Sequence, residues 1–97
     1  MATGEGPLPR TVVTSQQYEK DAKRLRSRGK DMTRLVAIVD ALRNRRPLDP
    51  RHRDHALVGD WRGYRECHIQ PDWLLIYRID EETISVARMG SHSDLFG

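Results

Sequence analysis

The first half of the chain has its apolar residues spaced as in amphipathic helices. A short β-branched run at residues 10–14 precedes two segments in which apolar side chains recur every three or four positions. Ser15 and Asp31 stand at the expected N-cap positions. Gly29 separates the two segments, and Pro47 stops the second. The pattern therefore predicts a strand and then a helical hairpin. Its apolar stripes comprise Tyr18, Ala22 and Leu25 in the first helix and Leu35, Val36, Ile38, Val39 and Leu42 in the second.

The second half of the chain is predicted to form strands. Three runs rich in β-branched and aromatic residues, 61–68, 72–79 and 83–89, are separated by turn residues. The middle run contains WLLIY, which is apolar on both faces and indicates the central, most buried strand. Residues 47–60 predict a long basic loop, a feature that is uncommon in compact domains unless it has a function. The order β-α-α-β-β-β predicts an α+β fold, with the hairpin packed on one face of a small, mainly antiparallel sheet.

Length and hydropathy limit the class of protein. We expect one domain at residues 10–97, after a flexible leader at residues 1–9 that is rich in Gly and Pro. The mean hydropathy is −0.73. No apolar run reaches the roughly 18 to 20 residues that cross a bilayer, and the start lacks the apolar centre of a signal peptide. A cytoplasmic protein without a membrane partner is expected. The single cysteine, Cys67, has no partner for an internal disulfide and is expected to be a buried strand residue.

Positive charge is concentrated in one connection. Lys and Arg number 17 against 14 Asp and Glu, which gives a formal net charge of +3. Between Arg43 and Arg53, five arginines accompany one acid, Asp49. Such a segment suits nucleic acid or another acidic partner, and a solvated loop accounts for it equally well. From charge and position alone, the candidate phosphate-binding residues are Arg51, Arg53, Arg65 and Arg88.

Histidine is the residue type that points to chemistry. All four histidines lie in the second half of the chain, together with Asp72; they are His52, His55, His68 and His92. Histidine both accepts and donates protons near neutral pH because its ordinary pKa is about 6.5. RNA cleavage without a metal needs both operations: a base removes the proton of a ribose 2′-OH, the freed oxygen attacks the adjacent phosphorus, and an acid protonates the departing 5′-oxygen. Histidines and an aspartate supply the base and the acid, and neighbouring arginines stabilise the charged phosphorane. This set of residues needs no cofactor.

The same residues also suit purely structural roles. His55 suits a polar loop, His68 a hydrogen-bonded position in a sheet, and Asp72 a tight turn after a proline. A zinc site is disfavoured, because no second cysteine assists and the arginines repel a cation, so no metal is expected. The sequence contains no nucleotide-binding, serine-hydrolase or metalloprotease motif. Three aromatic residues are assigned to packing: Trp61, Trp73 and Tyr77.

Three sequence motifs carry a family resemblance. They are DHxLxGxWxGYRxxH at residues 54–68, PDWLLIY at residues 71–77 and GxHxxLFG at residues 90–97. Together they resemble the YafQ-like branch of the RelE/ParE toxin superfamily, and the helical hairpin before them is compatible with the same fold. The resemblance covers nearly the whole chain beyond the leader, and the three motifs together are far more specific than any one of them.

The resemblance implies a function, partners and a set of site residues. YafQ-like toxins belong to type II toxin–antitoxin systems and cut mRNA in the ribosomal A site. The implied partners are therefore mRNA, the ribosome with its 16S rRNA, and a cognate antitoxin. A phenylalanine near the family's active site matches Phe96, which either stacks on a base or fills the core. The family's active-site histidines and aspartate match His55, His68, Asp72 and His92.

Roles for these residues follow as hypotheses. His92 is the candidate general acid, and His68 with Asp72 is the candidate base or base-orienting pair. The acid and base roles could be exchanged. His55 is expected to contribute to proton transfer or phosphate contact. Arg65 and Arg88 are the candidate stabilisers of the phosphorane.

Two rival functions use the same fold or the same charge. One is a non-catalytic toxin that inhibits DNA gyrase, like the ParE branch of the superfamily. A binding module of that kind has no need for several histidines and an aspartate at the motif positions. The other rival is a plain RNA- or ribosome-binding domain, for which salt-sensitive binding without cleavage is expected.

Overall fold

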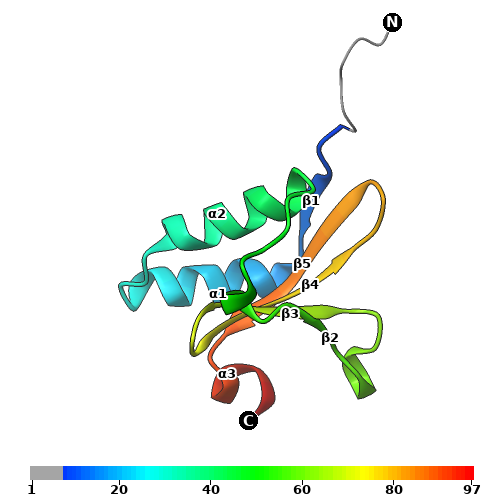
Figure 1. The fold of residues 1–97 in the computed structure, drawn as a ribbon. Coiled ribbons are helices and arrows are strands. Elements are labelled where there is room, and N and C mark those ends of the chain that lie inside the picture. The colour runs from blue at the N-terminus through cyan, green and yellow to red at the C-terminus, as the bar shows by residue number, and fades with distance from the viewer. Residues whose placement is uncertain (1–7) are drawn as a thin grey trace, which may run out of the picture.

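The computed structural model describes residues 8–97 and has the expected α+β architecture, with helices on one side of a sheet (Figure 1). Of the expected flexible leader, residues 1–7 lie outside the described residues. The helices are α1 (Gln16–Ser27), α2 (Met32–Arg43) and α3 (His92–Phe96), with short 3-10 turns η1 (Pro50–His52) and η2 (Gly59–Trp61). The strands are β1 (Thr11–Thr14), β2 (His55–Ala56), β3 (Arg65–Gln70), β4 (Trp73–Ile79) and β5 (Thr83–Gly90).

Within residues 8–97 the strands form a five-stranded sheet in the order β1-β5-β4-β3-β2. The strand β1 runs parallel to β5, with Thr11 opposite Thr83, and the other neighbours are antiparallel. The WLLIY segment of β4 occupies the middle of the sheet, and all five of its residues are buried. The prediction of a central buried strand is therefore confirmed.

The two predicted N-caps begin α1 and α2. The side chain of Ser15 accepts a hydrogen bond from the backbone N–H of Tyr18, and that of Asp31 accepts one from Thr33. The apolar stripes of both helices pack into one core with the facing side of the sheet. Val36 is the exception, because its side chain points away from this core and is 64% exposed.

The basic connection at residues 47–60 is more ordered than the predicted loop. It contains η1 and the two-residue strand β2, which pairs with β3 so that His55 lies opposite Glu66. The predicted strand 61–68 begins only at Arg65, because Trp61 belongs to η2 and Gly63 has a φ of 93°. The sheet thus gains an edge strand that the hydrophobic pattern did not indicate, since both β2 residues are exposed.

The C-terminal residues fold back as α3. Ser91 and Asp94 form a capping box at its start, in which each side chain accepts a hydrogen bond from the backbone N–H of the other. Asp94 also makes ion pairs with Arg28 at 3.2 Å and Arg24 at 3.6 Å on α1. These contacts fix the position of His92 relative to the sheet.

Burial agrees with most of the packing assignments. Trp73 and Tyr77 are almost fully buried, as is Cys67, where burial raises the pKa of the thiol to about 12. Trp61 is only half-buried and packs edge to face on Tyr64. No helix within residues 8–97 is long and apolar enough to cross a membrane.

Candidate active site

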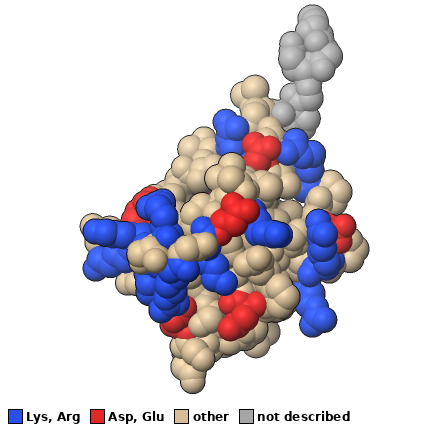
Figure 2. Space-filling view, turned by 90° about the vertical axis from the view of Figure 1, so that its left-hand side faces the viewer, with Lys and Arg blue, Asp and Glu red and all other residues tan. Residues whose placement is uncertain are grey.

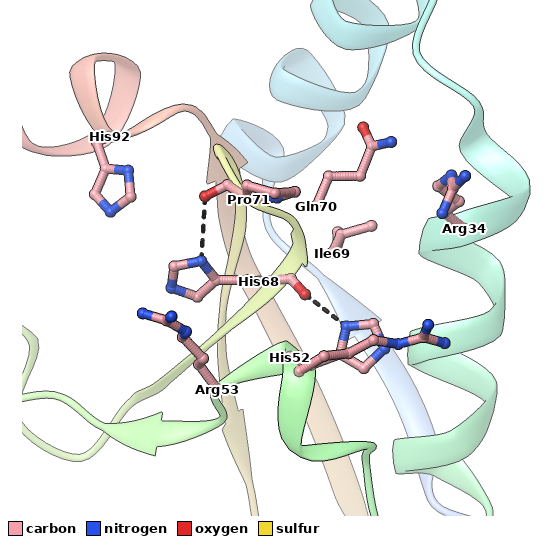
Figure 3. Close-up of a pocket in the computed structure, with 9 residues that line it drawn as sticks. Arg34, His52, Arg53, His68, Ile69, Gln70, Pro71 and His92 are labelled. Carbon is pink, nitrogen blue, oxygen red and sulfur yellow. Dashed lines mark hydrogen bonds between the residues drawn. The ribbon is translucent and has the colours of Figure 1, made fainter.

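A cleft of about 620 Å³ opens between α2, η1 and α3, over the end of β3 (Figure 3). His92, His68 and Arg53 lie together toward α3, whereas Arg34 lies toward α2 (Figure 3). The lining includes imidazole, guanidinium and amide groups, the donors that a site for a polar, anionic ligand requires. Its residues are Arg34, Arg51, His52, Arg53, His68, Ile69, Gln70, Pro71 and His92.

His92 and Asp72 form a hydrogen-bonded pair at the mouth of this cleft. One carboxylate oxygen of Asp72 accepts hydrogen bonds from the His92 backbone N–H at 3.0 Å and from Nδ1 at 2.8 Å. These two bonds, the backbone one first, hold the pKa of Asp72 below its ordinary value. The pairing fixes the proton of a neutral His92 on Nδ1 and leaves Nε2 free to act on a substrate.

His68 stands beside His92 on the floor of the cleft. The centroids of the two rings are 5.8 Å apart, with an interplanar angle of 61°. His68 donates from Nδ1 to the carbonyl of Pro71 at 3.3 Å, and its own backbone carbonyl accepts a bond from Nδ1 of His52 at 2.7 Å (Figure 3). The carboxylate expected to orient His68 is therefore bonded to His92 instead. The hydrogen bond from His52 stabilises strand β3, which carries His68.

His55 is linked to His68 by Glu66, a residue that the sequence analysis did not single out. The described lining of the cleft does not include His55, whose Nε2 lies 3.4 Å from a carboxylate oxygen of Glu66. The same oxygen lies 3.7 Å from Nε2 of His68. Alternation along β3 puts Glu66 on the same face as His68. Its contact with His55 depends on strand β2, which the hydrophobic pattern did not indicate.

Four predicted phosphate-binding arginines divide into two groups. Arg51 and Arg53 line the cleft, and Arg53 has a φ of 49°, a left-handed conformation that is costly for a residue with a side chain and that tends to occur at functional sites. The other two are absent from the described lining, because each binds a carboxylate elsewhere. Arg65 pairs with Asp54 at 3.2 Å, and Arg88 with Asp21.

Arg34, at the start of α2, lines the cleft and was not predicted. Its contribution depends on the packing of the helical hairpin beside η1, which has no local signal in the sequence. Positive charge also extends beyond the cleft: on the side of the molecule that carries the α1–α2 turn, Lys and Arg side chains gather in clusters with fewer acids between them (Figure 2).

Two further expectations concern Phe96 and a metal. Phe96 is 49% exposed on α3, so it does not fill the core, and the described lining of the cleft does not include it. Within residues 8–97 no group of three His, Cys, Asp or Glu side chains is arranged to hold a metal ion. The arrangement places two imidazoles, those of His92 and His68, next to guanidinium groups, a side-chain type whose geometry matches phosphate.

Comparison with known proteins identifies the family. Residues 10–97 match the family of YafQ, described as the bacterial toxin of a type II toxin–antitoxin system. The chain belongs to the YafQ toxin family. The mRNA interferase toxin YafQ of Escherichia coli (strain K12) is 41% identical over 91 residues, which cover 93% of this chain and 99% of that protein.

Solved structures of bacterial toxins share the fold. The E. coli DinJ–YafQ toxin–antitoxin complex matches with a TM-score of 0.86 and 41% identity, covering 93% of this chain and 100% of that one. A metal-bound toxin from Helicobacter pylori matches with a TM-score of 0.84 and 43% identity, covering 90% and 99% of the two chains. The family that the sequence motifs resemble and the fold class predicted from the order of elements are thus confirmed.

Proposed function

We propose that this chain is the toxin of a type II toxin–antitoxin system and an endoribonuclease that cleaves mRNA in the ribosomal A site and so inhibits translation. The observation that carries the proposal is the convergence of the Asp72–His92 pair and His68 on one cleft lined by arginines. Family membership and the name of the E. coli relative, an mRNA interferase, support the same substrate.

In the proposed reaction His92 is the base and His68 the acid, the reverse of the assignment made from the sequence. The reason is that Asp72 accepts a hydrogen bond from Nδ1 of His92, so Nε2 of the same ring keeps a free lone pair. Nε2 of His92 takes the proton of the 2′-OH, and the 2′-oxygen forms a bond to the adjacent phosphorus. The bond from phosphorus to the 5′-oxygen breaks, and His68 supplies the proton of the departing oxygen. The products are a 2′,3′-cyclic phosphate and a 5′-hydroxyl, and no cofactor is consumed.

Arginines of the cleft stabilise the charge that develops on the phosphorane. Arg53 lies beside His68, and Arg34 extends the positive lining toward α2 (Figure 3). Arg51 also lines the cleft. Arginine is suited to this role because its planar fork matches the geometry of a phosphate group. We assign to Phe96, which is half-exposed on the helix that carries His92, stacking on a base of the mRNA.

The proposal includes partners and a compartment. A cognate antitoxin is expected to bind and silence the protein, as suggested by the solved E. coli DinJ–YafQ complex. Action on ribosomes, through contacts with 16S rRNA and mRNA, implies a cytoplasmic protein. We further propose that residues 10–97 act as one toxin domain, since the family match spans that range.

Mapping the 5′ ends of transcripts after brief induction tests this function. The wild-type protein and a control, Arg26→Ala on the exposed face of α1, are expected to produce cuts at defined positions within codons. His92→Ala is expected to remove these cuts. Arrested growth with intact mRNA and defective supercoiling would favour the gyrase inhibitor instead. Intact mRNA with salt-sensitive binding to ribosomes would favour a plain RNA-binding domain.

A further inference from the structure

Asp54 connects the segment that carries two site residues to the middle of the sheet. In the chain it stands between Arg53, which lines the cleft, and His55, which begins β2. Its carboxylate accepts hydrogen bonds from the phenol O–H of Tyr77 on β4 and from Nη2 of Arg65 on β3, the latter at 3.2 Å. A side chain from the basic connection thus contacts two strands of the sheet. Asp54 takes no part in the proposed proton transfer, although it opens the first of the three sequence motifs.

Tyr77 gives Asp54 a rigid point of attachment. The tyrosine belongs to the buried WLLIY segment and is 1% exposed. A buried phenol needs a hydrogen-bond acceptor, and Asp54 supplies it. Burial, and then the neighbouring carboxylate, raises the pKa of Tyr77 above its ordinary value of 10, so the hydroxyl remains a donor at neutral pH. The position of the Asp54 carboxylate is therefore set by the core.

The segment around Arg53 needs such an attachment. Strand β2 contains two residues, both exposed, and so short a strand adds little stability by itself. Arg53 has a φ of 49°, a conformation that costs free energy and persists where surrounding contacts impose it. On either side of the segment the chain is bonded to the sheet or its approach: His52 bonds to β3, and the N–H of Leu57 donates to the carbonyl of Tyr64. Between these two points, Asp54 adds the contact with the central strand.

We propose that Asp54 is a positioning residue for RNA binding: its bonds to two strands of the sheet hold Arg53 in the left-handed conformation that places the guanidinium in the cleft. This inference rests on the proposed function and deepens it, because it names what fixes a phosphate-binding group beside His68 (Figure 3). It also gives Arg65 a role outside the cleft, as the charge partner of the Asp54 carboxylate.

Charge and position predict opposite effects when Asp54 is removed. Asp54 is an anion next to Arg53 in the chain, and Arg51 and Arg53 both line the cleft. If Asp54 acted through its charge alone, its loss would strengthen the binding of RNA, because the field around the cleft would become more positive. If Asp54 holds Arg53 in place, its loss removes a phosphate contact and weakens binding. The sign of the change in affinity therefore separates the two roles.

The first test is the affinity of the protein for a single-stranded RNA oligonucleotide, measured at several salt concentrations. Asp54→Ala is expected to weaken binding about five-fold at about 0.1 M salt and to reduce the slope of log affinity against log salt by about 0.7, as loss of one phosphate contact implies. Tyr77→Phe keeps the charge of Asp54 and removes the hydroxyl, so it should change the affinity in the same direction. Asp54→Asn keeps an acceptor oxygen for Tyr77 and should bind no more weakly than the wild type.

Asp60→Ala is the matched control, because Asp60 is an exposed acid in η2. This variant loses the same charge and should bind RNA as tightly as the wild type or more tightly. If Asp54→Ala binds as tightly as Asp60→Ala, the proposal is overturned.

The second test needs no RNA and follows amide hydrogen exchange in the folded protein. The N–H of Arg53 donates to the carbonyl of Pro50 at 3.0 Å, and that of Leu57 to the carbonyl of Tyr64 at 2.9 Å. In Asp54→Ala these two amides should exchange at least about tenfold faster, as loss of a hydrogen bond to a charged group implies, while the amides of β4 keep their wild-type rates. Unchanged rates at Arg53 and Leu57, or an equal rise throughout β4, would overturn the proposal. A wild type that does not cut mRNA would refute the proposed function, and both measurements would still decide the role of Asp54 because neither depends on cleavage.

Discussion

Asp72 lies only four positions after His68 in the sequence, in a turn, and the sequence therefore predicted that Asp72 pairs with His68. The structure joins Asp72 to His92 instead, 20 positions away, because α3 brings the tail back over the β3–β4 turn. Motif residues therefore identified which groups meet, but the pairing between them depends on a long-range contact. The same limit applies to Glu66, whose contact with His55 depends on the pairing of β2 with β3.

Asp72→Asn is expected to slow cleavage without weakening substrate binding. An amide cannot accept the Nδ1 proton in the way that a carboxylate does and does not stabilise the protonated ring, so the rate should fall by about 10²-fold, the lower end for an acid–base group. Single-turnover cleavage at saturating protein gives the rate. Asp60→Asn, an exposed control in η2, should cleave at the wild-type rate. An Asp72→Asn variant as fast as this control would contradict the role of the pair.

The pH range over which Asp72 acts follows from its bonds to His92. These bonds lower its pKa below the ordinary 3.8. Because the pKa of Asp72 is lower in the folded protein than its ordinary value, the ionised carboxylate stabilises the folded protein fully at pH values above that ordinary pKa. This stabilisation is lost as the pH falls through the pKa that Asp72 has in the folded protein. Asp72 should therefore stay ionised through any fall in activity that occurs above its ordinary pKa of 3.8.

Arg53→Ala tests the phosphate-binding role of the cleft. Removal of one contact with single-stranded RNA should reduce the slope of log affinity against log salt by about 0.7. Binding of an RNA oligonucleotide, titrated at several salt concentrations, measures this slope. Arg26→Ala removes the same charge from an exposed position on α1 and should leave the slope unchanged. Equal slopes for Arg53→Ala and the wild type would place the RNA elsewhere.

At the scale of elements, the sequence predicted the pieces that have strong periodicity. Both long helices, their caps and the central strand appear where the apolar pattern and cap residues indicate. The short elements β2 and α3, of two and five residues, were missed because such lengths are too brief for a periodic signal. These two elements carry His55 and His92, so the site was less predictable than the fold.

Gly90→Ala is expected to disturb α3 and, through it, His92. An added Cβ would lie 2.8 Å from Cβ of Asp94, the residue that completes the capping box of α3. Gly63→Ala is the matched control, because its φ is also positive while its Cβ would meet nothing within 4 Å. Gly63→Ala should lose about 1–2 kcal/mol of unfolding free energy from backbone strain, and Gly90→Ala should lose more, because its Cβ also collides with Asp94. Only Gly90→Ala should also lose cleavage rate; equal rates in the two variants would contradict the importance of α3 placement.

At the scale of the whole molecule, Asp21 joins α1 to the sheet. It is fully buried and accepts hydrogen bonds from Nε and Nη2 of Arg88 and from the backbone N–H of Met89 on β5. Arg24 continues the network to Asp94 on α3. The sequence did not predict this network, since Asp21 lies in a helix whose pattern shows only a charged position, and its arginine partner was assigned to RNA.

Asp21→Asn is expected to destabilise the protein by about 3–5 kcal/mol, because it leaves Arg88 partly buried without its charge partner. Asp40→Asn removes an exposed pair with Arg46 and should cost less than about 1 kcal/mol. Urea unfolding at pH 7 measures both. Equal midpoints for the two variants would contradict the structural role of Asp21.

The cost of Asp21→Asn should depend on pH. Burial would raise the pKa of Asp21, but hydrogen bonds from Arg88 and Met89 outweigh it and the pKa is lowered from its ordinary 3.8. The stabilisation by ionised Asp21 is therefore fully present at pH values above its ordinary pKa. It is lost as the pH falls through the pKa that Asp21 has in the folded protein. The difference between wild type and Asp21→Asn should narrow when unfolding is repeated at progressively lower pH below that value.

The central claim is that His92 and His68 act together on one phosphate of the mRNA. Single-turnover cleavage of mRNA on programmed ribosomes, with identification of the new ends, tests it with His68→Ala, His92→Ala and the double variant. We predict 5′-hydroxyl and 2′,3′-cyclic phosphate ends, a loss of at least about 10²-fold in each single variant, and a double variant little slower than the slower single one. Wild-type rates in both single variants, or 5′-phosphate ends, would contradict the account.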